Sequence, residues 1–401
     1  MLVASLAFAA VLFASPQEPA VLALRVTPIE FDAGEHGRFP SLSASAHDTL
    51  HLCWFAPGTE LGTTQLQHSV WRDKTWQPST SLASGRDWLV NWADFAKYQE
   101  DAQGHAVASW QTFSADKRGY GVTRKLRAKV DGPWSAATSL HLDRAGVEHG
   151  FVAFAALGAG RFFATWLQST ATGPPTNLRY TILNVDGVPS EEFVLDDLVC
   201  DCCSTAAIAL PSGEVVVAYR NRSTDEVRDL RVVRGNPADP NSWTAPTAVD
   251  KEGWKTQSCP VNGPALANDG NFISLVFYTE GATGMPQVKY LSSKDGGKSF
   301  GLPLPIAGGK TCLGRVAVAQ LPAGGPAIVA WLEQSESGAH WVSCAIPRSG
   351  QPIAVVPIAA VTGARADGFL QLAASANTVF AAWTSSNPAP TAVKLARIEL
   401  E

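Results

Sequence analysis

An apolar hairpin pattern that ends on an aromatic residue recurs seven times along this 401-residue chain. Successive copies end 52 to 59 residues apart, so the pattern extends over most of the sequence. A period of this length indicates one supersecondary unit that is repeated along a line or around an axis. The residues that end the seven copies are Trp54, Trp110, Trp166, Tyr219, Tyr278, Trp331 and Trp383.

Within each copy, the residue pattern predicts four antiparallel strands. Two runs of alternating apolar and polar residues are joined by a short turn such as "SG" or "DG", which is typical of a tight hairpin. A third strand follows, and in several copies a fourth begins near an aromatic residue and a proline. Four-stranded units repeated around an axis describe an all-β fold, the β-propeller. We expect seven blades, with six as the alternative if one hairpin is irregular.

The two ends of the chain complete this prediction. Residues 2–14 form an apolar run that is typical of an export signal peptide or of an uncleaved N-terminal anchor. We therefore expect a signal at residues 1–20 and a single propeller domain over 21–401, in a secreted or periplasmic monomer. The last copy has only three strands, so the strand predicted at residues 21–29 would complete it and close the ring.

Composition excludes several kinds of partner. The chain is 46% hydrophobic and 17% charged, so it can bury a large core. Its formal net charge of −5 shows no basic excess, and we expect no nucleic-acid partner. After residue 14 no apolar run reaches the length of a membrane span, so no span is expected once a signal is removed.

One copy contains a sharper motif, the segment 293–300 with the sequence "SKDGGKSF". It fits the pattern S-x-D-x-G-x-[ST]-[FW], and with it the chain resembles the sialidase superfamily of Asp-box (BNR-repeat) propellers. The motif predicts a turn in which Asp295 accepts backbone N–H bonds while Gly296 and Gly297 take positive φ. It lies between third and fourth strands and therefore indicates the fold rather than the chemistry.

The resemblance also implies a site. A sialidase of this superfamily holds the substrate carboxylate with three arginines and uses a tyrosine nucleophile and an acidic group. It implies Arg38, in "GRFPSL", with Arg220 and Arg315 as the arginines and Asp94 as the acid. The chain has no tyrosine after Tyr290, where the family has its nucleophile. We therefore expect binding or processing of an anionic, glycan-type ligand, and a glycoside hydrolase of exo-sialidase type only if the protein is an enzyme.

The repeat supplies its own prediction of where that ligand would lie. The position sixteen residues before each final aromatic residue is polar in most copies and falls at the start of the innermost strand, at the mouth of a central channel. Ordinary loop polarity explains this equally well, and an inert mouth would make the protein an interaction scaffold. The candidates are Asp94 and Glu333 for catalysis, and Arg38, Arg220, Arg222, Asn262, Arg315 and Asp367 for ligand binding.

Five of the seven cysteines fall on equivalent loops of three consecutive copies. In an exported protein the favoured interpretation is disulfide bonding, for example Cys203 with Cys259. The alternative is a thiolate site for a copper or zinc ion. A charged segment, residues 220–229, lies on the same predicted face and either binds an anion or pairs internally. The candidate metal ligands are Cys202, Cys203, Cys259, Cys312 and His149.

Overall fold

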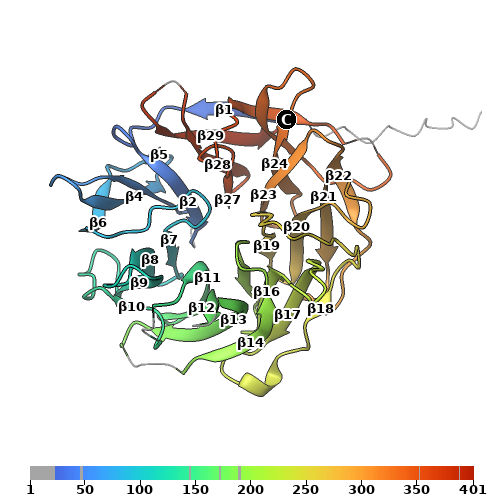
Figure 1. Ribbon diagram of the computed structural model, residues 1–401. Helices are drawn as coiled ribbons and strands as arrows, with labels where there is room; N and C mark the ends of the chain where they lie inside the picture. Colours follow the sequence, from blue (N-terminus) through green and yellow to red (C-terminus); the bar gives the residue numbers. More distant parts are fainter. Residues whose placement is uncertain are drawn as a thin grey trace, which may run out of the picture.

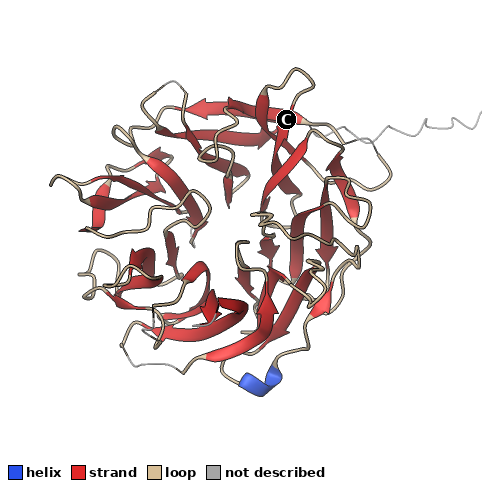
Figure 2. Ribbon diagram, viewed as in Figure 1, coloured by secondary structure: helices blue, strands red, loops and turns tan. Residues whose placement is uncertain are grey.

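The seven repeats form a closed ring of seven four-stranded antiparallel blades, as predicted (Figure 1). The computed structural model describes residues 23–45, 48–143, 146–170, 173–187, 191–351, 353–387 and 389–401, so the predicted signal at 1–20 lies outside the described residues. Within these ranges the fold is nearly all β, with one short 3₁₀ helix, η1 (Pro240–Ser242) (Figure 2). No helix in them is long and apolar enough to cross a membrane.

The first strand of each of blades 1 to 7 faces the axis of the ring, and residues of these strands line a common central channel of about 580 Å³. The innermost strands are β2 (Arg38–Ala44), β7 (Lys97–Glu100), β11 (His149–Gly158), β15 (Ala206–Ala209), β19 (Ala265–Asp269), β23 (Cys312–Gln320) and β27 (Gln371–Ser375). The second strands are β3 (Leu50–Pro57), β8 (Ala106–Phe113), β12 (Arg161–Thr170), β16 (Val215–Arg220), β20 (Phe272–Thr279), β24 (Ala327–Gln334) and β28 (Thr378–Ser385).

The third and fourth strands build the rim of the ring. The third strands are β4 (Thr64–Arg72), β9 (Tyr120–Arg127), β13 (Gly173–Asn184), β17 (Leu230–Gly235), β21 (Gln287–Ser293), β25 (His340–Ala345) and β29 (Ala392–Leu400). The fourth are β6 (Thr80–Gly85), β10 (Thr138–Ser139), β14 (Phe193–Val199), β18 (Thr247–Ala248), β22 (Leu304–Gly308), β26 (Val356–Val361) and β1 (Leu24–Ile29), and β5 (Thr75–Trp76) adds a short pairing to β4.

The N-terminal strand closes the ring, which confirms the prediction from the incomplete last copy. Strand β1 pairs antiparallel with β29 over six residue pairs, from Leu24 opposite Leu400 to Ile29 opposite Leu395. Blade 7 is therefore assembled from both ends of the chain, and the alternative of six blades is not needed.

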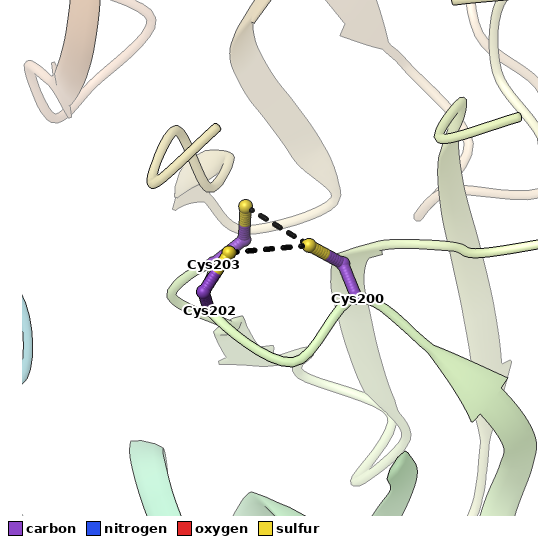
Figure 3. Close-up of side chains that lie close together, drawn as sticks. All are labelled: Cys200, Cys202 and Cys203. Atoms are coloured by element: carbon purple, nitrogen blue, oxygen red, sulfur yellow. Dashed lines mark hydrogen bonds between the residues drawn. The ribbon is translucent and has the colours of Figure 1, made fainter. Parts of the chain in front are cut away.

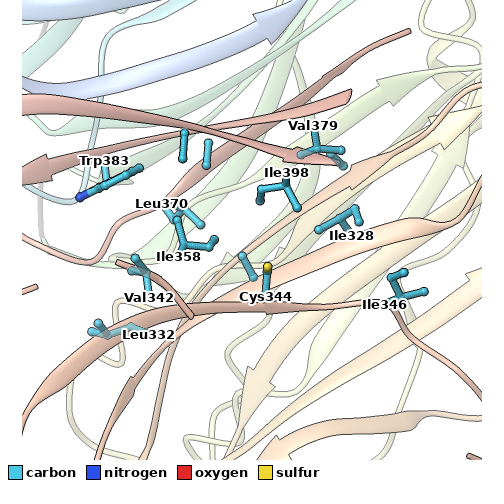
Figure 4. Close-up of a cluster of buried hydrophobic side chains, with 14 of the residues drawn as sticks. Ile328, Leu332, Val342, Cys344, Ile346, Ile358, Leu370, Val379, Trp383 and Ile398 are labelled. Carbon is cyan, nitrogen blue, oxygen red and sulfur yellow. The ribbon is translucent and has the colours of Figure 1, made fainter. Parts of the chain in front are cut away.

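The core is divided among the interfaces between blades. Seven clusters of buried apolar side chains lie between successive blades, one for each interface. Figure 4 shows the cluster between blades 6 and 7, in which Val342 and Cys344 of one blade face Val379 and Ile398 of the next. Burial of these contiguous apolar faces is the main favourable contribution to folding of such a ring.

The aromatic residues of the repeat lie in the second strands and are at most 6% exposed. In six blades this residue packs toward the preceding blade, as Trp54 does in the cluster between blades 7 and 1. Blade 5 differs, because Tyr278 packs toward blade 6 and Phe277 packs toward blade 4. Successive side chains on a strand point to opposite faces, so the repeat register of blade 5 is shifted by one residue from the predicted one.

The predicted turn at residues 293–300 has the expected geometry. Asp295 Oδ1 accepts the backbone N–H of Ser299 at 3.0 Å and the hydroxyl of Ser293 at 2.7 Å. Gly296 and Gly297 have φ of +71° and +81°, a conformation that glycine adopts without steric strain. The turn connects β21 to β22 and supports the blade, away from the loops described below.

Candidate functional site

Polar residues at the starts of the innermost strands connect neighbouring blades. The carboxylate of Asp94, before β7, accepts the backbone N–H of Phe151 in β11 at 2.8 Å. The side-chain oxygen of Asn262, before β19, accepts the backbone N–H of Arg315 in β23 at 2.6 Å. The guanidinium of Arg315 in turn donates to the backbone carbonyl of Asp367, before β27. The repeat therefore located contacts between three pairs of neighbouring blades, and each contact uses part of the hydrogen-bonding capacity of the side chain.

Arg220, one of the predicted ligand-binding arginines, is the last residue of β16 and is 2% exposed. Its guanidinium donates to the carbonyls of Asn262 at 2.8 and 3.0 Å, of Arg228 at 2.7 Å and of Tyr278 at 2.6 Å. It also lies 4.6 Å from the ring centroid of Trp254. In this structure its donors are used to join blades 4 and 5.

Asp94 is 2% exposed, and one of its oxygens, Oδ1, has no hydrogen-bond partner within the described ranges. Burial raises the pKa of its carboxyl to about 7, against the opposing effects of the Phe151 N–H and of Lys97. Gly150 makes this position possible, because a Cβ there would lie 2.3 Å from Asp94 Oδ2. Asp94 thus has the protonation behaviour of an acid–base group near neutral pH.

Three cysteine thiols converge in the loop between β14 and β15 (Figure 3). The sulfur of Cys200 lies 3.7 Å from that of Cys202 and 3.4 Å from that of Cys203, and all three sulfurs are within 4.8 Å of one another. Cys200 and Cys203 are buried and Cys202 is partly exposed. Four sulfurs at about 2.3 Å from a tetrahedral zinc ion are separated by about 3.8 Å, so the observed separations fit such a site.

The surroundings of Cys200 favour its thiolate. Arg228 Nη1 donates to Cys200 Sγ at 3.2 Å. Hydrogen bonding by Cys202 and then by Cys203 holds the pKa of the Cys200 thiol far below its usual range, and the charge of Arg220 acts in the same direction. A thiolate is the form in which cysteine binds metal ions. Hydrogen bonding to Cys200 raises the pKa of the Cys202 thiol, and burial raises that of Cys203, so an ion would have to displace their protons as it binds.

Two further groups lie beside the three thiols on the solvent side. The carboxylate of Asp201, the sulfur of Cys202 and the sulfur of Cys259 are within 4.8 Å of one another. Cys259 is exposed and comes from the loop between β18 and β19, which leads from blade 4 to blade 5. We call the group Cys200, Cys202, Cys203 with Asp201 and Cys259 the cysteine site.

Of the other predicted residues, Arg222 lies beside the cysteine site, with its Nη1 3.6 Å from Asp201 Oδ2, and the four that follow lie elsewhere. Cys312 is buried in the cluster between blades 5 and 6. His149 stacks on His141 with a ring separation of 3.6 Å. The carboxylate of Glu333, at the end of β24, accepts from Trp331 Nε1 at 3.0 Å and from Ser343 Oγ at 2.5 Å. Arg38 begins β2, with its guanidinium 6.0 Å from the ring of Phe39.

The favoured expectation of disulfide bonds is not met. All seven cysteines, which lie in the described ranges, are free thiols, and the proposed partners Cys203 and Cys259 are not bonded. The sulfur separations of 3.4 and 3.7 Å at Cys200 exceed the roughly 2.0 Å of an S–S bond.

The charged segment 220–229 pairs mostly within itself. Glu226 accepts from Arg222 at 2.7 Å and from Arg228 at 2.9 Å. The contact of Arg228 with Cys200, and the inclusion of Cys200 among the converging thiols, were not predicted. The spacing of Cys200, Cys202 and Cys203 was the available signal, since a tight turn after a strand can bring residues two and three apart together.

Comparison with protein-family models found no match, and comparison with curated proteins found none. A protein described as of unknown function from Dyadobacter fermentans DSM 18053 has a solved structure with TM-score 0.51 and 12% identity, covering 94% of this chain and 99% of that one. The polysaccharide lyase Uly1 has TM-score 0.54 and 8% identity, covering 92% and 93%. A Hadza microbial sialidase has TM-score 0.47 and 11% identity, covering 91% and 65%. At these identities the likeness shows the β-propeller fold alone.

Proposed function

We propose that the protein binds a thiophilic metal ion, Zn(II) or Cu(I), at the cysteine site. The observation that carries the proposal is the convergence of three sulfurs at separations of 3.4 and 3.7 Å. Thiolate ligands select these ions over Mg(II) or Ca(II), which prefer oxygen. Cys200, Cys202 and Cys203 would supply three ligands, and Cys259 or Asp201 the fourth.

The neighbouring side chains suit this role. Three thiolates around one divalent ion carry net negative charge, which the guanidinium of Arg228, 3.2 Å from Cys200, would offset. Two of the sulfurs are buried, whereas Cys202 and Cys259 border solvent and leave a path for the ion to enter. A bound ion would tie the loop before blade 4 to the loop before blade 5.

The test is a metal titration of the full chain, reduced and then freed of reductant under argon. We expect one Zn(II) or Cu(I) per chain by mass spectrometry of the desalted protein, with four thiols lost to a thiol reagent when the ion binds through Cys259, or three when it binds through Asp201. Cys200→Ala and Cys203→Ala should each weaken binding by about a hundredfold or more, because each removes one thiolate ligand.

Two other cysteines provide matched controls. Cys312→Ala removes a residue that the sequence placed among the ligands, and Cys344→Ala removes a thiol buried between blades 6 and 7. Both variants should bind the ion as the unmodified protein does. Absence of bound metal from the reduced protein, or equal losses in all four variants, would refute the proposal.

The anionic, glycan-type ligand expected from the sequence is not part of this proposal. The three arginines expected to hold that ligand do not have the same surroundings. The guanidinium of Arg220 is bonded to backbone carbonyls, whereas Arg38 and Arg315 are partly exposed. Export to a secreted or periplasmic location and a monomeric state remain predictions from the sequence.

A further inference from the structure

A second cavity lies beside the cysteine site, among the loops of blades 5, 6 and 7. Its volume is about 450 Å³, within the range of roughly 300–1,000 Å³ that is usual for small-molecule sites. Trp92, from the loop that precedes β7 of blade 2, reaches across the ring to form one wall and packs against Phe369 at 5.5 Å. Arg315 and Arg365 supply positive charge to the lining, and Cys259 lies at its border.

Both arginines contact the same aromatic ring, that of Trp92. Each guanidinium carbon lies 5.7 Å from the ring centroid of Trp92, and that of Arg315 is also 4.4 Å from the ring of Phe369. Cation–π contacts of this kind hold the guanidinium groups in place but leave their charge uncancelled. The cavity therefore has an aromatic wall that two cations contact.

Neither guanidinium forms an ion pair with a described residue. In the part of the chain that the structure describes, no carboxylate lies within 4.0 Å of Arg315 or of Arg365. The carboxylate of Asp367 attracts Arg315, but it is fully buried and its oxygens accept from Thr362 and Ser386. The positive charge of the cavity thus has no direct counter-charge within these residues.

Arg315 also retains free donors. One of its N–H groups donates to the carbonyl of Asp367, and its Nε and Nη2 atoms have no acceptor in the described ranges. Neither atom is sealed from solvent, so both remain accessible to a ligand. Burial, with repulsion from Arg365, lowers the pKa of Arg315 to about 10, and the group stays charged at neutral pH. A half-buried cation without a partner is unfavourable until an anion binds it.

We propose that this cavity binds a small organic anion. Its carboxylate or phosphate group lies between Arg315 and Arg365, because the planar guanidinium pairs with both groups through two parallel hydrogen bonds. Its carbon skeleton packs against Trp92. This site does not depend on the metal ion proposed above.

The first test is calorimetric titration of the metal-free full chain with glucuronate, glucose 6-phosphate and, as a neutral control, glucose. We expect binding of at least one of the two anions, no binding of glucose, and affinity that falls as salt is added. Which anion binds more tightly identifies the anionic group. If neither anion binds, or if glucose binds equally well, the proposal is wrong.

The second test uses substitutions. Arg365→Gln changes an exposed residue and should weaken anion binding about tenfold or more. The matched control is Arg161→Gln, at the exposed arginine that begins β12 directly after its turn from β11, and this variant should bind as before. Equal affinity in the Arg365 and Arg161 variants would overturn the proposal.

Arg315→Gln should abolish binding, but it also removes a contact between blades 6 and 7, so its melting temperature is measured beside its affinity. If that variant does not fold, the Arg365 comparison decides. Metal affinity of the Arg365 variant should be unchanged, so failure of anion binding and failure of metal binding would be seen separately.

Discussion

The loop after β16 and the cavity beside Trp92 both place arginines near the mouth of the ring, but in opposite electrostatic situations. Around β16, Arg220 is bonded to three backbone carbonyls, and Arg222 and Arg228 share the carboxylate of Glu226. In the cavity, Arg315 and Arg365 face an aromatic ring and no carboxylate of the described chain.

The difference shows that the density of charge in a sequence is a poor guide to a ligand site. The segment 220–229 is the most strongly charged stretch noted in the sequence, and its charges are largely satisfied within the protein. The two cavity arginines are 50 residues apart and inconspicuous in the sequence. An unpaired charge in a concave site is the stronger indication of an external partner.

Arg220→Gln should have the largest effect. The shorter amide leaves several buried carbonyls without a donor, and we expect the free energy of unfolding to fall by about 3–5 kcal/mol. Urea denaturation followed by tryptophan fluorescence measures this loss. Arg365→Gln should change stability by less than about 0.5 kcal/mol, and a similar loss in both variants would remove the contrast between the two regions.

Asp94→Asn tests a buried carboxylate that, like the arginines of the cavity, lacks a full set of partners. Because burial raises the pKa of Asp94 from 3.8 to about 7, the folded protein binds this proton more tightly than the unfolded chain does. The cost of ionising Asp94 is therefore absent below about pH 4, grows between pH 4 and pH 7, and is complete above pH 7.

The asparagine variant does not bear this cost. Relative to the unmodified protein, its free energy of unfolding should rise by about 2–4 kcal/mol between pH 4 and pH 8. Denaturation curves at a series of pH values provide the measurement. Parallel pH profiles for the two proteins would mean that Asp94 titrates normally.

Apart from the Arg365→Gln comparison, Arg222→Gln should have the smallest effect on stability. Its ion pair with Glu226, at 2.7 Å, is partly exposed, with 18% and 17% of the two side chains accessible. Such pairs contribute about 0.2–1 kcal/mol and are weakened by salt. Melting temperatures in low and high salt measure the change. A loss of stability as large as that of Arg220→Gln would mean that the Arg222–Glu226 ion pair stabilises the fold as strongly as the buried bonds of Arg220 do.

The fold was predictable because the repeat is a direct consequence of packing. Each blade must bury one aromatic residue against its neighbour, so Trp54 or Trp331 recurs at a fixed place. The one-residue shift of the repeat in blade 5 was not predicted. Phe277 and Tyr278 are both aromatic, and they differ only in the face of the strand from which each side chain points.

The site was predictable only in part. The cysteine loops could be aligned by the repeat, and Cys202 and Cys203 do lie together. Cys312 occupies an equivalent position of the repeat but begins strand β23 and points into the core, since an equivalent position in the sequence does not fix the direction of a side chain. The contact between Trp92 and Arg315 joins residues more than 200 positions apart, which no local pattern indicates.

Closure by β1 and β29 has a consequence for the order of events during synthesis. The six residue pairs of these strands join the first described strand to the last described strand. Blades 1 to 6 can form in succession as the chain emerges, but β1 has to wait for a partner until translation reaches residues 392–400. The ring is therefore completed only after residues 392–400 have been made.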